Sequence, residues 1–209
     1  MNALLLIDIQ KDFLPGGSLE VPEGDRIIPA VNEIQEYFDI VVATQDWHPE
    51  DHGSFASNHP GKQPGDRIEL DGVEQILWPD HCIQETEGAD FADDLKMDRV
   101  EKIIRKGTDP LVDSYSGFYD NQHKRATGLH EYLREKEVDT VTIVGLAADV
   151  CVRYTALDAL ELGYKVFLVR NATRAVGGGE VLEDTLRELR EKGVGMVESS
   201  GIKDMFNGS

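Results

Sequence analysis

The sequence predicts an α/β fold of three layers, in which a mostly parallel, six-stranded sheet carries helices on both faces. Three observations support this prediction. Short β-rich segments alternate with segments of helical periodicity along much of the 209-residue chain. The first strand-like segment is largely apolar, as expected for a strand that is buried on both faces. Strands that alternate with helices are joined by crossover connections, which make neighbouring strands parallel.

The first half of the chain should contribute three strands and one helix. Residues 3–9 form the first strand, and residues 40–44 and 100–106 form the next two. Residues 26–38 form a helix because four apolar side chains recur on one face: Ile27, Val31, Ile34 and Phe38. The segment 46–98 lacks clear periodicity and is rich in Gly, Pro, His and Asp. A segment this long without regular elements is often functional, and we interpret it as a metal-binding loop region.

The second half should contribute three helices and three strands. A short helix is expected around 129–133, followed by the most β-branched strand at 140–146. The next helix should begin near Asp149 and place four residues on its apolar side: Val150, Tyr154, Leu157 and Leu160. A strand at 165–169 precedes a helix at 181–192, which Gly193 ends, and the last strand covers 194–198.

Composition excludes several classes of protein. The 40 acidic and 21 basic side chains give a formal net charge of -19, which repels nucleic-acid phosphates and anionic lipid. No apolar run is long enough to span a bilayer, and the N-terminal run ends at Asp8 without a basic region before it. With only two cysteines and no linker or repeat, we expect one cytoplasmic domain over residues 1–209.

Three reactive side chains follow predicted strands, where ligands bind in open α/β sheets. Asp8 ends the first strand, Lys106 ends the third, and Cys151 lies just past the fourth. A thiol at a helix N-terminus is favoured as thiolate, and the backbone N–H groups there can hold an oxyanion. A carboxylate can carry the proton, and an ammonium group can restrain that carboxylate. Taken singly, each residue is more often a buried hydrophobe, a turn residue or a solvated edge.

A second set of residues has the chemistry of a metal site. Asp46 and His48 are two residues apart, so they face the same side of an extended segment. With His81 they offer one carboxylate and two imidazoles, which suit a divalent transition metal with open positions. His52 is an additional candidate. The alternative is that these are solvated loop residues, and His81 contributes only if the fold returns it to the site.

Together these motifs resemble the nicotinamidase branch of the isochorismatase-like cysteine hydrolases over nearly the whole chain. The motifs are LIDIQKDF at 6–13, TQDWHP at 44–49, DHGSFA at 51–56, WPDHC at 78–82, RKG at 105–107, DSYSGF at 113–118 and GLAADVCV at 145–152. The resemblance implies a six-stranded parallel sheet. It also implies that Asp8, Lys106 and Cys151 form the catalytic triad.

The resemblance assigns further roles around the triad. A cis peptide between residues 146 and 147 would direct the N–H of Ala147, with that of Cys151, into an oxyanion hole. Phe13 and Trp78 match residues that contact a pyridine ring, although aromatic residues are more often part of the core.

The resemblance also specifies the metal site. Asp46, His48 and His81 match the metal ligands, while Gln10 and Ser54 match positions near the metal and its waters. The spacing around His52 is similar to that of members in which this histidine is not a ligand. Zinc is the expected ion, ahead of iron or manganese.

The implied reaction is hydrolysis of nicotinamide to nicotinate and ammonia through a cysteine thioester, with the metal orienting the pyridine nitrogen. Pyrazinamide should also be accepted. The resemblance implies neither a nucleic-acid nor a membrane partner, and homo-oligomers occur in the family. One alternative is another amidohydrolase of the superfamily that acts on a different small amide. A second alternative is a non-catalytic binding domain, against which the complete triad and metal set argue.

Overall fold

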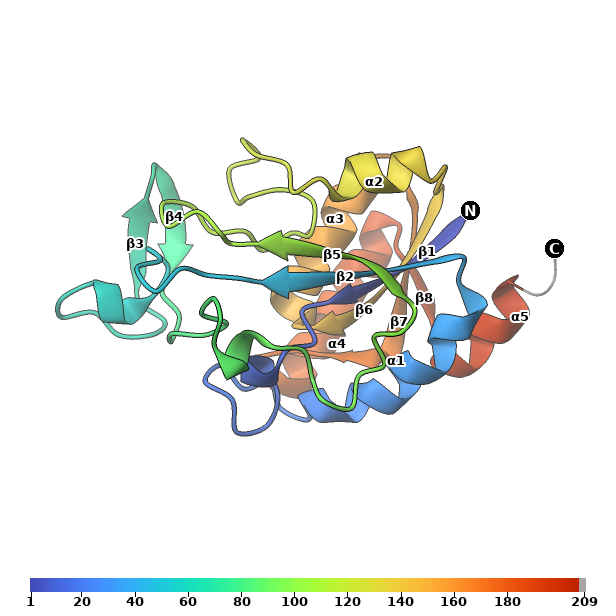
Figure 1. Ribbon diagram of the computed structural model, residues 1–209, viewed down its shortest axis with the longest axis horizontal. Helices are drawn as coiled ribbons and strands as arrows, with labels where there is room; N and C mark the ends of the chain where they lie inside the picture. The colour runs from blue at the N-terminus through green and yellow to red at the C-terminus, as the bar shows by residue number, and fades with distance from the viewer. Residues whose placement is uncertain (207–209) are drawn as a thin grey trace.

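A six-stranded sheet, with every neighbouring pair of strands parallel, forms the centre of the computed structural model (Figure 1). Its order is β5-β2-β1-β6-β7-β8. The strands are β1 Asn2–Ile7, β2 Ile40–Asp46, β5 Val100–Lys106, β6 Thr140–Leu146, β7 Lys165–Arg174 and β8 Gly195–Val197. The structure describes residues 1–206, and residues 207–209 of the predicted domain lie outside it. The predicted fold class is confirmed.

Helices cover both faces of this sheet. One face packs against α2 Leu129–Glu135, α3 Arg153–Glu161 and α4 Gly178–Lys192, and the other against α1 Ile28–Ile34 and α5 Ile202–Phe206. The apolar run of strand β1 is continuous because its side chains enter the hydrophobic cores on both faces of the sheet. Ala3, Leu5 and Ile7 enter the core under α2, α3 and α4. Leu4 and Leu6 enter the core under α1 and α5. A strand buried on both faces needs apolar residues at every position.

Several predicted elements differ from the observed ones. Strand β1 ends at Ile7 and not at residue 9, and the helix expected from near Asp149 is a π-helical turn at Ala148–Val152 followed by α3 from Arg153. The helix expected at 26–38 is divided into the 3-10 turn Gly24–Ile27, helix α1 and the 3-10 turn Gln35–Tyr37. Pro29 lies in the first turn of α1 and has no N–H to continue an α-helix from the preceding turn. Strand β7 extends past the apolar run that ended the prediction at 169, and the register shifts where it continues. Strand β8 is shorter than the expected 194–198.

The segment 46–98 contains a hairpin that the sequence analysis missed. Strands β3 Arg67–Leu70 and β4 Val73–Ile76 pair antiparallel around a two-residue turn. Asp71 and Gly72 both have positive φ, of 46° and 86°, as a type I′ turn requires. The Asp-Gly pair was the available signal. Figure 1 shows this hairpin at one end of the molecule, opposite α5.

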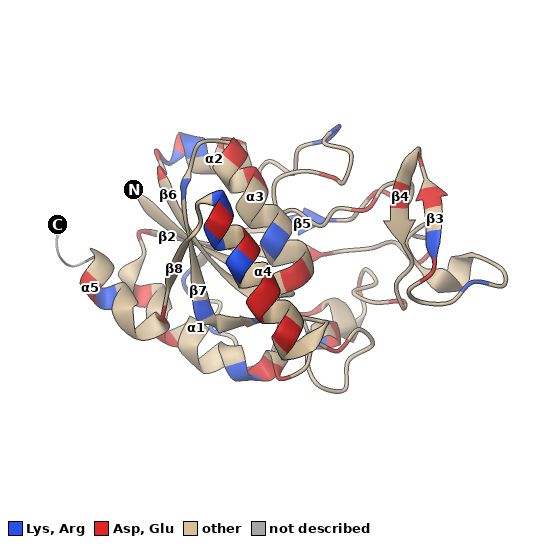
Figure 2. Cartoon of the chain, turned by 180° about the vertical axis from the view of Figure 1, so that it is seen from behind, with Lys and Arg blue, Asp and Glu red and all other residues tan. Residues whose placement is uncertain are grey.

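Charged side chains are spread over the surface. Figure 2 shows acidic residues along α4, interspersed with basic ones, and Arg153 of α3 bonds Glu188 of α4 at 2.8 and 2.6 Å. No helix within residues 1–206 combines the length and the apolar character needed to cross a bilayer.

Candidate active site

The carboxyl ends of four strands bring the predicted catalytic residues together. Asp46 and Lys106 are the last residues of β2 and β5 and are direct register partners. Asp8 follows β1, and Cys151 lies in the π-helical turn Ala148–Val152 between β6 and α3. Asp8, Lys106 and Cys151 are all buried, with exposed fractions of 0%, 2% and 6%. Residues far apart in the sequence therefore meet at one edge of the sheet.

Two glycines make this arrangement sterically feasible. A Cβ on Gly145, whose φ is +115°, would lie 2.1 Å from the carbonyl oxygen of Ile7 on the neighbouring strand. A Cβ on Gly107, whose φ is +64°, would lie 2.4 Å from Cε1 of His48. Only glycine combines a positive φ with this lack of volume. The backbone after Lys106 thus leaves room for the His48 ring.

The Lys106 ammonium joins the two sets of predicted site residues. Its Nζ donates to Asp46 Oδ1 at 2.6 Å and to the Ser114 carbonyl oxygen at 2.9 Å. It also forms an ion pair with Asp8 Oδ2 at 2.9 Å and lies 3.4 Å from Cys151 Sγ. One buried positive charge therefore serves a carboxylate from the predicted triad and one from the predicted metal set.

Asp8 lies within reach of the thiol and is held from the opposite side. Its Oδ1 accepts a hydrogen bond from Thr44 Oγ1 at 2.6 Å, and its carboxylate lies within 4.8 Å of Cys151 Sγ. Burial raises the pKa of Asp8, although Lys106 opposes this effect. A carboxylate with a raised pKa is a better proton acceptor at neutral pH.

Burial also controls the charge of the other two residues. It raises the pKa of the Cys151 thiol well above its ordinary value, and the nearby Lys106 only partly opposes the rise. For Lys106 burial favours the neutral amine, but Asp46 and Asp8 outweigh it and raise the pKa. The expectation of a favoured thiolate at the helix N-terminus is therefore wrong for the free site. The sulfur must lose a proton to a neighbouring base before it can attack.

The three predicted metal ligands meet beside Lys106, with their ligand atoms within 4.8 Å of one another. His48 Nε2 lies 3.5 Å and His81 Nε2 3.8 Å from Asp46 Oδ2. Ligand atoms placed 2.0–2.1 Å from a tetrahedral ion would be roughly 3.3 Å apart. These separations are long for hydrogen bonds and close to those expected around one cation.

The tautomers of the two histidines also suit a metal. His48 Nδ1 lies 2.9 Å from the Gly107 carbonyl oxygen, and His81 Nδ1 lies 2.7 Å from that of Pro79. Carbonyl oxygens only accept, so we assign the proton to Nδ1 in both rings, which leaves each Nε2 as a lone pair directed at Asp46. Ligating histidines in proteins are oriented by the same kind of bond.

Charge complementarity holds this cluster together. Burial would raise the pKa of Asp46, but Lys106 and then His48 outweigh it, so the carboxyl is ionised. For His48 burial lowers the pKa, while Asp46 more than compensates and raises it overall. Burial, followed by the charge of His48, lowers the pKa of His81 to about 4. The donor set of one carboxylate and two imidazoles fits a divalent transition metal.

His52 differs from the other two histidines. Its Nδ1 accepts from the Ser54 backbone N–H at 3.2 Å and lies 2.7 Å from Ser54 Oγ. The proton of the neutral ring is therefore assigned to Nε2, which is buried without a partner in residues 1–206. Burial, with the charge of His48, lowers the pKa of His52 to about 4. A ligand nitrogen of His52 also lies within 4.8 Å of ligand atoms of His48 and Asp113, so its place outside the ligand set stays a prediction.

Gln10 and Ser54 support the cluster through different groups. Gln10 Oε1 accepts from the Asp46 N–H at 2.8 Å, and Gln10 Nε2 donates to the Asp46 carbonyl at 2.8 Å. The side chain thus brackets the main chain of Asp46. Ser54 bonds His52, so it reaches the predicted ligands only through that ring.

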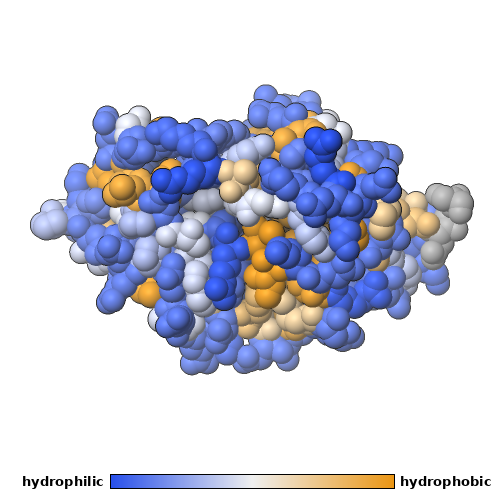
Figure 3. Space-filling model, turned by 45° about the horizontal axis from the view of Figure 1, so that its top comes forward, coloured by the Kyte–Doolittle hydropathy of each residue, from blue (hydrophilic) through white to orange (hydrophobic). Residues whose placement is uncertain are grey.

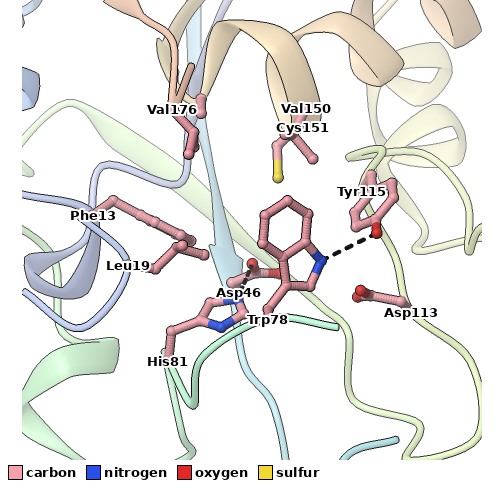
Figure 4. Close-up of a pocket in the computed structure, with 11 residues that line it drawn as sticks. Phe13, Leu19, Asp46, Trp78, His81, Asp113, Tyr115, Val150, Cys151 and Val176 are labelled. Carbon is pink, nitrogen blue, oxygen red and sulfur yellow. Dashed lines mark hydrogen bonds and ion pairs between the residues drawn. The ribbon is translucent and has the colours of Figure 1, made fainter. Parts of the chain in front are cut away.

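A pocket lies in front of the sulfur. Figure 4 shows Cys151 on one side, His81 and Asp46 on the opposite side, and Phe13 and Trp78 between them. Apolar side chains also gather in the middle of the face shown in Figure 3, surrounded by hydrophilic ones. The aromatic and apolar walls of this pocket suit a small flat ring.

Ala147 also lines this pocket, directly after the peptide bond that joins it to Leu146. That bond is cis, as the resemblance implied. The Ala147 carbonyl accepts from the N–H groups of Val150 and Val152, both at 3.1 Å, which winds the turn that carries Cys151. A π-helical turn of this kind is frequently found at functional sites.

Two polar pocket residues received no role in the sequence analysis. Tyr115 and Asp113 line the pocket, and the Tyr115 hydroxyl accepts from Trp78 Nε1 at 3.1 Å (Figure 4). Both belong to the motif at 113–118, but no pattern in that motif indicates which side chain faces a pocket. Only the position of the loop over the end of β5 reveals it.

Comparison with known proteins identifies the class. The isochorismatase domain model matches residues 2–200, so the chain belongs to the isochorismatase family of hydrolases. The nicotinamidase of Acinetobacter baylyi is 44% identical over 200 residues, covering 96% of this chain and 94% of the relative.

Two solved structures extend this similarity. The yeast nicotinamidase bound to the inhibitor nicotinaldehyde has a TM-score of 0.89 at 34% identity, covering 95% of this chain and all of that chain. The pyrazinamidase of Pyrococcus horikoshii in complex with zinc has a TM-score of 0.77 at 42% identity, covering 94% of this chain and 98% of that one.

Proposed function

We propose that this enzyme is a nicotinamidase that hydrolyses nicotinamide to nicotinate and ammonia through a thioester on Cys151. One observation carries the proposal. The Cys151 thiol lines a pocket and lies beside the Asp8 carboxylate and the Lys106 ammonium, and the opposite side of that pocket presents Asp46 and His81, which form a cluster with His48. The relatives named nicotinamidase support the choice of substrate.

The cluster of Asp46, His48 and His81 would hold one divalent transition metal. Zinc is the expected ion, supported by the pyrazinamidase solved with zinc, and the same donors also suit iron or manganese. When bound, such an ion supplies a Lewis-acidic contact for a ring nitrogen of the substrate. Phe13 and Trp78 would flank the ring, which directs its amide toward Cys151.

In the first half of the reaction Asp8 takes the proton of the Cys151 thiol. The resulting thiolate attacks the amide carbon, and the carbonyl electron pair moves to the oxygen. The backbone N–H groups of Ala147 and Cys151 receive this oxyanion. As the carbonyl re-forms, the C–N bond breaks and Asp8 returns the proton to the nitrogen. Ammonia leaves, and the acyl group stays on sulfur as a thioester.

In the second half water replaces the sulfur. Asp8 takes a proton from water, whose oxygen attacks the thioester carbon, and the same N–H groups hold the second oxyanion. The C–S bond then breaks, the proton on Asp8 returns to the sulfur, and the acid product leaves as nicotinate after its carboxyl proton passes to solvent. Lys106 stays charged, because Asp46 remains ionised beside its ammonium while Asp8 carries the proton, and it keeps Asp8 oriented toward the sulfur.

The test is ammonia release from nicotinamide by the purified enzyme, with benzamide and pyrazinamide as comparison substrates. Pyrazinamide keeps both the ring nitrogen and the amide and should be hydrolysed, whereas benzamide lacks the ring nitrogen and should be poor. Equal rates on benzamide and nicotinamide would rule out recognition of the ring nitrogen. They would then favour an amidohydrolase for a different small amide.

We further propose that the reaction takes place in the cytoplasm without nucleic-acid or membrane partners. The free thiols of Cys82 and Cys151 support a reducing compartment, and the net charge of -19 disfavours anionic partners.

A further inference from the structure

The β3–β4 hairpin buries one residue of its two strands, and that residue is polar. The strands are otherwise half-buried or exposed, whereas Gln75 is 1% exposed. A buried amide is costly unless its hydrogen bonds are made. An apolar side chain would be the ordinary occupant of such a position, so the bonds of Gln75 need an explanation.

The Gln75 amide reaches across to the loop that walls the pocket. Its Nε2 donates to the Tyr115 hydroxyl at 2.9 Å and to Asp113 Oδ2 at 3.0 Å, and it lies 2.7 Å from the carbonyl oxygen of Ile76. Two amide hydrogens therefore serve three acceptors, which restricts the position of the side chain from three directions. Two of these acceptors, Tyr115 and Asp113, line the pocket itself.

The Tyr115 hydroxyl links this amide to Trp78. Its oxygen accepts from Gln75 Nε2 and, at 3.1 Å, from Trp78 Nε1. A hydroxyl oxygen has two lone pairs, so these two donors occupy both. The rings of Trp78 and Tyr115 also meet edge to face at 6.3 Å. The position of the indole in Figure 4 thus depends on a hydroxyl whose second donor comes from the hairpin.

We propose that Gln75 is a positioning residue of the substrate pocket, which sets the Trp78 wall through the Tyr115 hydroxyl. The inference rests on the proposed function, because it assumes that a flat aromatic amide binds against Trp78. Gln75 touches neither Cys151 nor Asp8, so it should affect ring binding rather than the chemical steps. A ring that binds against a loosened wall loses contact area with the indole, while Phe13 still flanks it from the other side of the pocket.

The matched variants are Gln75→Met and Gln122→Met. Methionine keeps the length of the side chain and removes the amide, and Gln122 ties the tip of the same hairpin to the same loop through Asp71, at 2.9 and 3.0 Å. Loss of the Gln75 hydrogen bonds to Tyr115 and Asp113 should raise KM for nicotinamide roughly tenfold in Gln75→Met, with kcat within about threefold. Gln122→Met should leave both constants unchanged.

A double-variant cycle separates positioning from general loosening. If Gln75 acts through the hydroxyl, Gln75→Met should add little to the KM of Tyr115→Phe. If Gln75→Met raised KM equally in the wild-type and the Tyr115→Phe enzymes, the inference would be overturned. It would also be overturned if Gln75→Met and Gln122→Met both lowered kcat and raised KM to the same extent.

Tryptophan fluorescence tests the inference independently of any activity measurement. The chain has two tryptophans, Trp47 and Trp78. Gln75→Met should shift the tryptophan emission, and the shift should vanish in a Trp78→Phe background. No shift, or a shift that persists without Trp78, refutes the inference. An enzyme that shows the Trp78-dependent shift but releases no ammonia from nicotinamide would refute the proposed function alone.

Discussion

Replacing Lys106 by methionine should destabilise the protein more than most single substitutions. The ammonium lies 2.6 Å from Asp46 Oδ1 and 2.9 Å from Asp8 Oδ2. At an effective dielectric constant of about 20, each contact attracts by about 6 kcal/mol. The cost of burying an ammonium offsets much of this sum. Because two buried carboxylates would remain without their shared partner, we expect the free energy of unfolding to fall by about 3–5 kcal/mol.

A second substitution tests whether the lost charge is the cause. Lys106→Met with Asp8→Asn removes one orphaned carboxylate, and the remaining Asp46 keeps His48 as a partner. The double variant should therefore recover at least about half of the lost stability. Neither variant should retain activity. The double variant lacks the Asp8 carboxylate that carries the proton, and the single variant lacks the ammonium that keeps this carboxylate ionised. We expect kcat/KM to fall at least about 100-fold.

Stability is measured by urea unfolding at pH 7.5 in the presence of a chelator, with circular dichroism as the signal. Activity is measured separately as ammonia release after metal has been added back. The chelator keeps metal binding from masking the change in stability. A loss below about 1 kcal/mol in Lys106→Met would refute the role of the ammonium. A double variant no more stable than the single one would show that packing, not charge, was lost.

Three further predictions concern the metal cluster. Gly107→Ala should weaken zinc binding at least about tenfold, because the new Cβ would lie 2.4 Å from the His48 ring. Calorimetry measures the affinity, and an unchanged value would contradict this packing. Removing the metal with a chelator should reduce the rate of nicotinamide hydrolysis at least about tenfold, and added zinc should restore the rate. Full activity in the presence of the chelator would show that no metal is needed. The metal-free protein should lose stability as the pH falls from about 6.5 to 4, because His52 and His81 have pKa values of about 4 when folded and about 6.5 when unfolded. The unfolded chain takes up more protons in this window, so denaturant titrations should show a slope of about 1.4 kcal/mol per pH unit for each histidine, and a flat profile would refute the shifts. His48 does not offset this slope, since its raised pKa keeps it protonated in both states there.

The sheet could be predicted because its physical cause is local. Strand β1 is apolar at odd and even positions, and each set enters a different core. The ends of β5 and β6 were predicted at Lys106 and Leu146, where the structure has them, whereas β1 ends at Ile7, two residues before its predicted end. These strand ends place Asp8, Lys106 and Cys151 at one edge. The extension of β7 could not be predicted in this way, because it continues past the apolar run through the exposed residues Arg170 and Asn171.

The contacts within the site depend on register, which the sequence does not display. Asp46 and Lys106 are 60 residues apart, and only the pairing of β2 with β5 makes them neighbours. For the same reason the sequence suggested two separate constellations, whereas the structure joins them through one ammonium. Gln75 and Tyr115 are 40 residues apart and meet only because the hairpin folds back over the loop after β5. No local pattern signals such a contact.

The protonation of Cys151 was misjudged because the argument from the helix N-terminus considered only the dipole. The sulfur is also nearly inaccessible to water, with 6% of the residue exposed. Burial disfavours a thiolate more strongly than the nearby Lys106 favours it. The degree of burial depends on how the loops close over the strand ends, which requires the structure.

The acyl group on sulfur is the step on which the proposed mechanism depends. The enzyme would be mixed with nicotinamide, quenched in acid within milliseconds, and analysed by peptide mass spectrometry. We expect a nicotinoyl group on the peptide that contains Cys151 and none on the peptide that contains Cys82. Normal turnover by Cys151→Ala, or a nicotinoyl group found on a different residue, would contradict the mechanism.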